Sequence, residues 1–153
     1  MNTIILAGID PGGTTGLAIA KALVTDKQVS LREVNLGSWK EPSQVLELIF
    51  LEHVQSIIME KRAQHPHSHA GLSPYEQIKF GLEELGYKPN PKGFQLNPMG
   101  IVLITPGIWK PVMEQLNVDY GSWIPTTPHE WDALKILHYG LRINSLRKMV
   151  MYE

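Results

Sequence analysis

The chain has 153 residues, no cysteine and a formal net charge of −1, from 14 basic and 15 acidic side chains. Its composition, 43% hydrophobic and 19% charged, is that of an ordinary globular protein and excludes a disordered or fibrous chain. The lack of cysteine excludes a disulfide scaffold, an iron–sulfur cluster and thiol catalysis. We expect one domain over residues 1–153, with no signal peptide, no membrane-spanning segment and a cytoplasmic location.

The first part of the chain predicts three strands followed by a helix. Apolar, β-branched runs are typical of buried strands, and a Gly- and Pro-rich segment between two of them is typical of a turn. The predicted strands are Thr3–Ile9, Leu17–Leu23 and Val29–Leu36, with the turn over Asp10–Gly16. Apolar residues at positions 45, 46, 48, 49 and 50 then predict a helix over Ser43–His53 with a broad buried face.

The rest of the chain alternates strands and helices. We expect a short strand over Val54–Glu60, a polar loop over 61–74, a helix over Tyr75–Leu85 stopped by Gly86, an extended segment over Pro89–Pro98 and a strand over Gly100–Thr105 ended by Pro106. The segment Thr127-Pro128-His129-Glu130 has the pattern of a capping box with proline at the first helical position, and it predicts a helix that runs to about Leu141. This order predicts an α/β fold with a mixed sheet flanked by helices.

Four side chains that can carry chemistry follow predicted strands or open the last helix. Asp10 follows the first strand and Glu60 closes the fourth, whereas His129 and Asp132 lie three residues apart on one face of the last helix. If the first and fourth strands are parallel neighbours, Asp10 and Glu60 end at the same edge of the sheet, and a helix packed over that edge would add the other two. The helix also carries residues that would allow close docking on the sheet: Ala133, Ile136 and Gly140.

Three carboxylates and one imidazole suit a pair of hard divalent cations. Mg²⁺ prefers oxygen ligands, and Mn²⁺ tolerates an imidazole. Two such ions about 3.5–4 Å apart activate a water and stabilise the leaving oxygen of a phosphodiester. Each residue alone also has an ordinary interpretation, with Asp10 as a turn former, Glu60 as a solvated charge, His129 as a surface residue and Asp132 as a partner of the helix dipole. The hypothesis of a metal site depends on the four together.

The motifs around these residues resemble those of a known family. Gly8-Ile9-Asp10-Pro11-Gly12, with Thr15-Gly16 and an apolar strand after it, resembles the first motif of RuvC-like Holliday junction resolvases, in the ribonuclease H-like superfamily. Ile57-Ile58-Met59-Glu60 resembles their second motif, and Ile104-Thr105-Pro106 with Trp109-Lys110 resembles the segment after their fifth strand. His129-Glu130-Trp131-Asp132-Ala133-Leu134 resembles their final motif. The motifs come in the family's order and span residues 8–134.

The resemblance implies a ribonuclease H-like fold, with a mixed five-stranded sheet in the order 3-2-1-4-5 flanked by helices. It implies a structure-selective endodeoxyribonuclease that cleaves Holliday junctions or other branched DNA, works as a homodimer, and acts in recombination and repair in the cytoplasm of a bacterium or of a phage-infected host. Asp10 would bridge two Mg²⁺ ions, Glu60 would bind one of them, and His129 with Asp132 would bind the other, with Mn²⁺ able to substitute. Attack by a metal-activated water would leave a 5′-phosphate and a 3′-hydroxyl.

Basic side chains near the predicted site are candidates for DNA contacts. We expect Lys61, Arg62, Lys79 and Lys110 to contact phosphates, which contribute affinity and salt sensitivity but no sequence preference. For Lys79, an ordinary solvated lysine is an equally good interpretation.

Histidine and tryptophan side chains offer further contacts. His65, His67 and His69 follow Glu60 in the polar loop, where they would stack on bases, touch phosphates, bind a stray metal ion or be incidental. Trp109 and Trp123 would be stacking platforms for bases or buried anchors of the fold.

Other functions are compatible with parts of the same pattern. Gly8-Ile9-Asp10 followed by Gly12-Gly13-Thr14-Thr15-Gly16 also resembles the first phosphate loop of the sugar kinase, actin and heat-shock ATPase class, although such proteins need two lobes around the nucleotide. A YqgF-like RNA-processing nuclease and a non-catalytic DNA-binding relative of the same fold are further alternatives. Substrates and nucleotides would discriminate among them.

Overall fold

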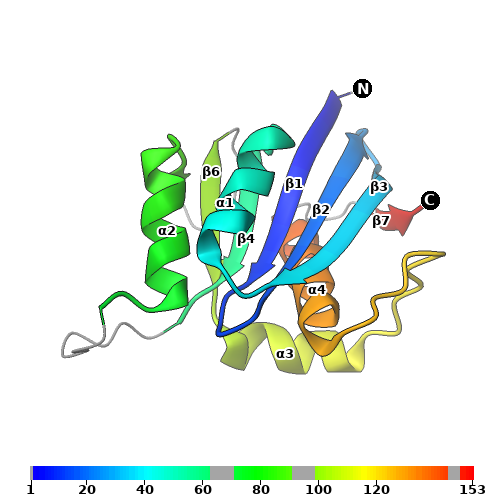
Figure 1. The fold of residues 1–153 in the computed structure, drawn as a ribbon. Helices are drawn as coiled ribbons and strands as arrows, with labels where there is room; N and C mark the ends of the chain where they lie inside the picture. Colours follow the sequence, from blue (N-terminus) through cyan, green and yellow to red (C-terminus); the bar gives the residue numbers. More distant parts are fainter. Residues whose placement is uncertain (1, 63–70, 91–98, 145–148) are drawn as a thin grey trace.

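A computed structural model describes residues 2–62, 71–90, 99–144 and 149–153, and these form seven strands and four helices (Figure 1). The strands are β1 (Asn2–Asp10), β2 (Thr15–Val24), β3 (Gln28–Trp39), β4 (Ser56–Glu60), β5 (Lys88–Pro89), β6 (Gly100–Ile104) and β7 (Met149–Tyr152). The helices are α1 (Pro42–Leu51), α2 (Pro74–Glu84), α3 (Pro106–Gln115) and α4 (Pro128–Asn144). No helix in the described part of the chain is long and apolar enough to span a membrane.

All described strands join one mixed sheet in the order β5-β6-β4-β1-β2-β3-β7. Strands β1, β2 and β3 form an antiparallel meander, and β4 and β6 run parallel to β1. The central order β3-β2-β1-β4-β6 is the predicted 3-2-1-4-5, so the expected ribonuclease H-like α/β fold is confirmed. The predicted count of five strands is too low for the described chain, because β5 and β7 extend the two edges. Both are short, and a two-residue or four-residue edge strand leaves little periodicity to detect.

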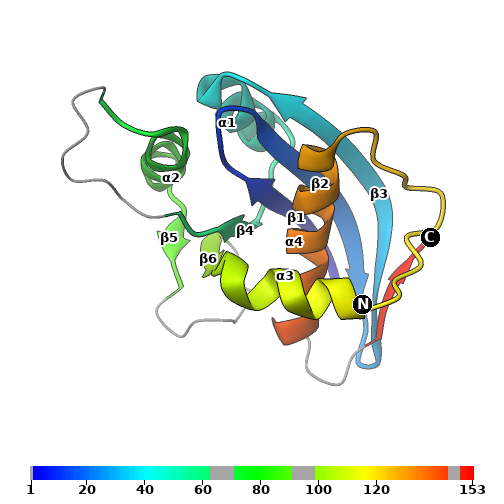
Figure 2. The same ribbon diagram turned by 90° about the horizontal axis from the view of Figure 1, so that it is seen from below.

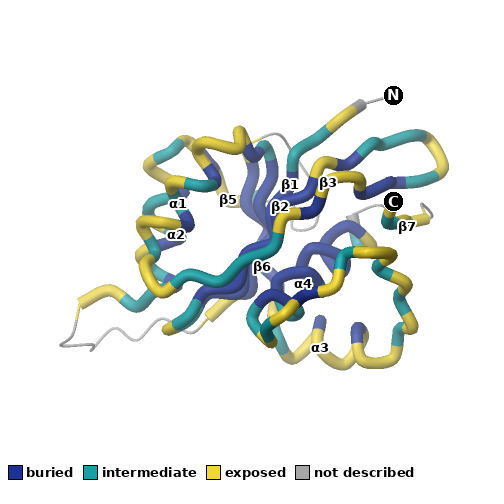
Figure 3. Tube along the Cα trace, turned by 45° about the vertical axis from the view of Figure 1, so that its right-hand side comes forward, coloured by how far each residue is buried: buried dark blue, intermediate teal, exposed yellow. Residues whose placement is uncertain are grey.

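The sheet separates two hydrophobic cores, one under each helix layer. Helices α1 and α2 cover one face, and α3 and α4 lie on the other, as the view from below shows (Figure 2). Successive residues of a strand point to opposite faces, so Leu6 packs toward α4 whereas Ala7 packs toward α1 and α2. The tube coloured by burial places the central strands between exposed outer surfaces of the helices (Figure 3).

The sequence pattern predicts the start of α4 and misses α3. The predicted N-cap is confirmed, because the Glu130 N–H donates to Thr127 Oγ1 at 3.1 Å. The Glu130 carboxylate accepts from the Thr127 hydroxyl at 2.8 Å, whereas in a full capping box it accepts from the backbone N–H of the cap residue. Helix α3 begins at Pro106, the residue that was expected only to end the preceding strand. Proline at a first helical position needs no N–H partner, so it starts this helix, while Pro111 inside it obscures the helical pattern.

Candidate functional site

Asp10 and Glu60 end neighbouring parallel strands. Asp10 is the last residue of β1 and Glu60 is the last residue of β4, and the pairing of Ile9 with Met59 puts the two carboxylates at adjacent positions. The Lys61 N–H donates to the Ile104 carbonyl at 2.8 Å, which continues the pairing with β6 past Glu60. The sheet ladder therefore fixes the backbone on which both carboxylates stand.

Both carboxylates face the side of the sheet that α4 covers. Leu6 of β1 and Ile58 of β4 belong to the core beneath α4, and strand alternation gives the same direction to Asp10 and Glu60. Both acidic residues are buried. A carboxylate this far from water needs a cation or hydrogen-bond donors beside it.

Glycines bring α4 into direct contact with the sheet at this point. The backbone of Gly16, which pairs with Asp10 across β1 and β2, lies against the backbone of His129, with no room for a side chain between them. Gly8 meets Ala133 in the same way, and Gly140 of α4 meets the side chain of Ile58. The predicted close docking of the last helix is confirmed, and it carries His129 to the carboxylate edge.

His129 lies beside Asp10. The His129 Nδ1 is 3.8 Å from Asp10 Oδ2, and its side chain is half-exposed. The two residues are 119 positions apart in the chain and meet only because α4 crosses the ends of β1 and β2.

Arg62 completes the arrangement on the other side of Asp10. Its Nη2 donates to Asp10 Oδ1 at 3.0 Å and lies 3.1 Å from Glu60 Oε2. The second contact is an ion pair without hydrogen-bond geometry, and within the described residues neither oxygen of Glu60 has a hydrogen-bond partner. A single nitrogen of Arg62 thus approaches both carboxylates.

Burial shapes the electrostatics of Glu60 and Asp132. Burial, followed by the adjacent Asp10 carboxyl, raises the pKa of Glu60 to about 7, whereas Arg62 and Lys110 act to lower it. Burial, followed by the charge of Asp10, also raises the pKa of the half-buried Asp132. Lys110, Lys135 and His129 oppose that rise. Since Asp10 acts on both, the three carboxylates share one electrostatic environment.

The four predicted metal-binding residues form no ready-made metal cluster. In the described ranges, no group of three or more His, Asp or Glu side chains is gathered closely enough to hold an ion. The guanidinium of Arg62 lies between the carboxylates of Asp10 and Glu60 instead. Metal binding by Asp10, Glu60, His129 and Asp132 stays a prediction, although their oxygen-rich donor set and the unpartnered oxygens of Glu60 fit a hard cation.

The lysines predicted to bind DNA separate into two groups. Lys61 and Lys110 are exposed, Lys61 beside Glu60 and Lys110 on α3, from which its charge acts on both Glu60 and Asp132. Lys79 lies on α2, in the helix layer of the opposite face.

Lys135 is a basic residue that sequence reasoning missed, although it lies three positions after Asp132 and therefore on the same side of α4. A cavity of about 240 Å³ opens between α3 and α4 beside Asp132. Two lysines belong to its lining, which consists of Trp109, Lys110, Met113, Glu114, Asp132 and Lys135.

The aromatic candidates have structural roles. Trp109 is buried against α4, so it anchors the fold and presents no open surface on which a base could stack. Trp123 packs partly against the same core, and its Nε1–H donates to the Glu153 carbonyl at 2.7 Å. The loop with His65, His67 and His69 lies outside the described residues.

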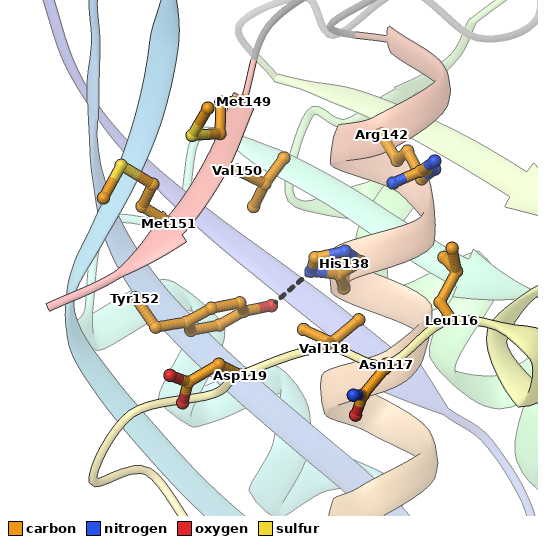
Figure 4. Close-up of a pocket in the computed structure, with 10 residues that line it drawn as sticks. All are labelled: Leu116, Asn117, Val118, Asp119, His138, Arg142, Met149, Val150, Met151 and Tyr152. Atoms are coloured by element: carbon orange, nitrogen blue, oxygen red, sulfur yellow. Dashed lines mark hydrogen bonds between the residues drawn. The ribbon is translucent and has the colours of Figure 1, made fainter.

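A second cavity, of about 380 Å³, lies between α4, β7 and the segment after α3 (Figure 4). His138 is buried in its wall, with Nδ1 2.8 Å from the hydroxyl of Tyr152. Burial, followed by the charge of Arg142, lowers the pKa of His138 to about 4, so the imidazole is neutral near pH 7. The sequence signal for this site is a histidine on an otherwise apolar stretch of the helix.

Comparisons with known proteins establish what fold this is. No family model matches the chain, and no curated protein matches it. Among solved structures, Thermus thermophilus RuvC is similar with a TM-score of 0.57 and 15% identity, over 93% of this chain and 98% of that one. A complex of T. thermophilus RuvC with a Holliday junction substrate matches with a TM-score of 0.51 and 15% identity, over 93% and 97%.

A viral protein gives the same result. The Fowlpox virus resolvase, in complex with Holliday junction DNA, matches with a TM-score of 0.56 and 16% identity, over 92% of this chain and 97% of that one. At such identities the likeness concerns the fold. The chain has the fold of RuvC-like Holliday junction resolvases, as its motifs predict.

Proposed function

We propose that this chain is a divalent-metal-dependent endonuclease that hydrolyses phosphodiesters in branched DNA such as Holliday junctions. Residues 1–153 would form one nuclease domain, and two copies would act as a homodimer. The observation that carries the proposal is the pair of buried carboxylates, Asp10 and Glu60, at adjacent strand ends, with His129 3.8 Å from Asp10. Solved structures of two proteins with this fold contain Holliday junction DNA, which supports branched DNA as the proposed substrate.

The residues at this edge suit two Mg²⁺ ions. Asp10 would contact both ions, Glu60 would contact one, and His129 with Asp132 would contact the other. Glu60 is buried and its oxygens have no hydrogen-bond partner among the described residues, and hard oxygen donors are the ligands that Mg²⁺ prefers. When bound, the ions would supply an activated water and neutralise charge at the scissile phosphate.

The protein's own side chains would hold the DNA backbone. Lys110 and Lys135 flank the cavity beside Asp132, and Lys61 is exposed next to Glu60. Ammonium groups in these places would contact phosphates on either side of the cleaved bond and give salt-sensitive affinity without reading the sequence.

The experiment is a substrate panel in Mg²⁺ and in Mn²⁺. Four-way junctions, three-way junctions, flaps, linear duplex and RNA–DNA hybrids are incubated with the wild type and with Asp10→Asn, which removes the charge but keeps the shape. We expect the wild type to cut branched DNA and Asp10→Asn to bind it without cutting. Cleavage by Asp10→Asn at the wild-type rate would reject the proposed site.

The same panel separates the alternatives. Preferred cleavage of RNA substrates would favour an RNA-processing nuclease, and binding without cleavage by the wild type would favour a non-catalytic DNA-binding protein. The kinase and ATPase class would be favoured if nucleotide raises the melting temperature while Mg²⁺ with junction DNA leaves it unchanged. Sedimentation with and without a four-way junction tests the homodimer.

A further inference from the structure

Arg62 is placed where a cation between two carboxylates would be placed. One nitrogen, Nη2, lies 3.0 Å from Asp10 Oδ1 and 3.1 Å from Glu60 Oε2. The Arg62 side chain is 45% exposed, whereas those of Asp10 and Glu60 are 6% and 1% exposed. The guanidinium of Arg62 therefore contacts a buried pair of acids, while the rest of its side chain is open to solvent.

The two carboxylates need positive charge at that position. They end adjacent strands, face the same side of the sheet and are almost fully removed from water, so their charges repel each other in a poorly screened place. Arg62 is the guanidinium in direct contact with both, and a guanidinium stays charged at any ordinary pH. Without a cation beside them, these two acids would have to share a proton or carry an uncompensated charge.

A guanidinium and a divalent cation cannot share this position. Mg²⁺ binds carboxylate oxygens at about 2.0–2.1 Å. An ion that close to Asp10 and Glu60 would occupy the space in which Nη2 now lies, and it would repel the arginine's charge. The side chain must then turn toward the solvent side of the site, where the DNA backbone would approach.

We propose that Arg62 is the internal counter-cation of the carboxylate pair, that divalent cations replace it, and that the released guanidinium then contacts a phosphate of the DNA. This inference rests on the proposed function. It gives Arg62 two positions, one on Asp10 and Glu60 and one on the nucleic acid. Arg62 therefore lowers the affinity of the site for metal, and metal binding raises the affinity of the protein for DNA.

The first test measures Mn²⁺ binding to the DNA-free protein, by electron paramagnetic resonance of the free ion. Arg62→Gln removes the charge and keeps a polar side chain, and Lys21→Gln is the control, because it removes one exposed positive charge from β2. We expect Arg62→Gln to bind Mn²⁺ at least about fivefold more tightly than the wild type, and Lys21→Gln to bind like the wild type. Equal affinity of Arg62→Gln and wild type would overturn the inference.

The same variants test the role of Arg62 in stability. In EDTA, Arg62→Gln should melt several degrees below the wild type, and Mn²⁺ should raise its melting temperature more than that of the wild type. A melting temperature of Arg62→Gln equal to that of the wild type in EDTA would show that the acids need no counter-cation and would contradict the inference.

A measurement on the wild type serves if Arg62→Gln does not fold. The Nη2–H resonances of Arg62, on the nitrogen that contacts both carboxylates, should be ordered and protected from exchange in EDTA, and they should lose that protection when Mg²⁺ is added. Unchanged resonances in Mg²⁺ would overturn the inference without any variant.

The DNA contact has its own readout. Four-way junction affinity is measured in EDTA and in Ca²⁺, for the wild type and Arg62→Gln. The gain in affinity from Ca²⁺ should be smaller for Arg62→Gln, because only the wild type releases a guanidinium. An equal gain would remove the DNA half of the inference.

Failure of the inference and failure of the proposed function give different results. If the wild type binds no Mn²⁺, or if Asp10→Asn binds it as well as the wild type, then the metal-dependent nuclease itself is wrong. If Asp10→Asn abolishes binding but Arg62→Gln leaves it unchanged, the metal site stands and only the role of Arg62 falls.

Discussion

The backbone of Gly16 on β2 lies directly against the backbone of His129 at the start of α4. Gly16 is also the residue that pairs with Asp10 across the antiparallel ladder. One position without a side chain therefore sets the distance between a predicted metal-binding imidazole and a predicted bridging carboxylate. Figure 2 shows α4 crossing the strands at this edge.

Gly16→Ala tests this relationship. The added methyl group would overlap the backbone of His129, so the start of α4 must shift or the fold must strain, at a cost of about 1–3 kcal/mol of unfolding free energy. Gly13→Ala is the control, because a Cβ there meets nothing within 4 Å. The unfolding free energy measured in urea and the affinity for Mn²⁺ should both be lower in Gly16→Ala than in the wild type. Both should stay near the wild-type values in Gly13→Ala. Equal stability of the two variants would mean that the helix does not depend on this contact.

His129→Asp distinguishes a metal ligand from a proton donor or base. An aspartate supplies an oxygen, which suits Mg²⁺ at least as well as nitrogen does, and an acidic residue at a helix N-terminus is favourable. Junction cleavage in Mg²⁺ should therefore be retained in His129→Asp and decrease in His129→Ala. Loss of all activity in His129→Asp, with normal folding and DNA binding, would assign proton transfer to His129.

Lys110→Gln and Lys135→Gln test the phosphate contacts beside Asp132. Each variant should weaken junction binding to a similar degree for every sequence, and should reduce the slope of log affinity against log salt by about one. Lys79→Gln, on the opposite helix layer, should leave that slope closer to the wild type. A larger effect from Lys79 than from Lys110 would place the DNA across the other face.

The sheet, most helices and the candidate site follow from local sequence signals. Apolar β-branched runs predict the meander and β4, and the Thr127–Glu130 capping box predicts where α4 begins. Strand ends also predict that Asp10 and Glu60 meet, because parallel neighbours end at one edge. These signals are short-range, and each can be read within a few residues.

The features that escaped prediction depend on contacts between distant segments. Helix α3 contains Pro111, and its stability comes from Trp109 and Met113 buried against α4 rather than from its own propensity. Strand β7 exists because it pairs with β3, more than a hundred residues earlier. Arg62 was predicted as a DNA contact, and its position on two buried acids could not be read from the sequence, because it needs the exact side-chain geometry of both strand ends.

The buried His138 predicts a loss of stability in weak acid. Its pKa is lowered to about 4 by burial and by Arg142. The Tyr120 ring packs against it, and the Tyr152 hydroxyl and Asp119 lie in the cavity that Figure 4 shows. The unfolded chain takes up this proton near its usual pKa of 6.5, so it binds more protons than the folded chain between about pH 6.5 and 4. Unfolding free energy should fall as the pH drops through this window, by at most about 1.4 kcal/mol per pH unit.

His138→Gln tests this prediction, because glutamine can still accept a hydrogen bond from Tyr152 and has no proton to gain. In urea unfolding at a series of pH values, the plot of unfolding free energy against pH should be flatter for His138→Gln than for the wild type. Parallel curves would show that His138 does not titrate on unfolding.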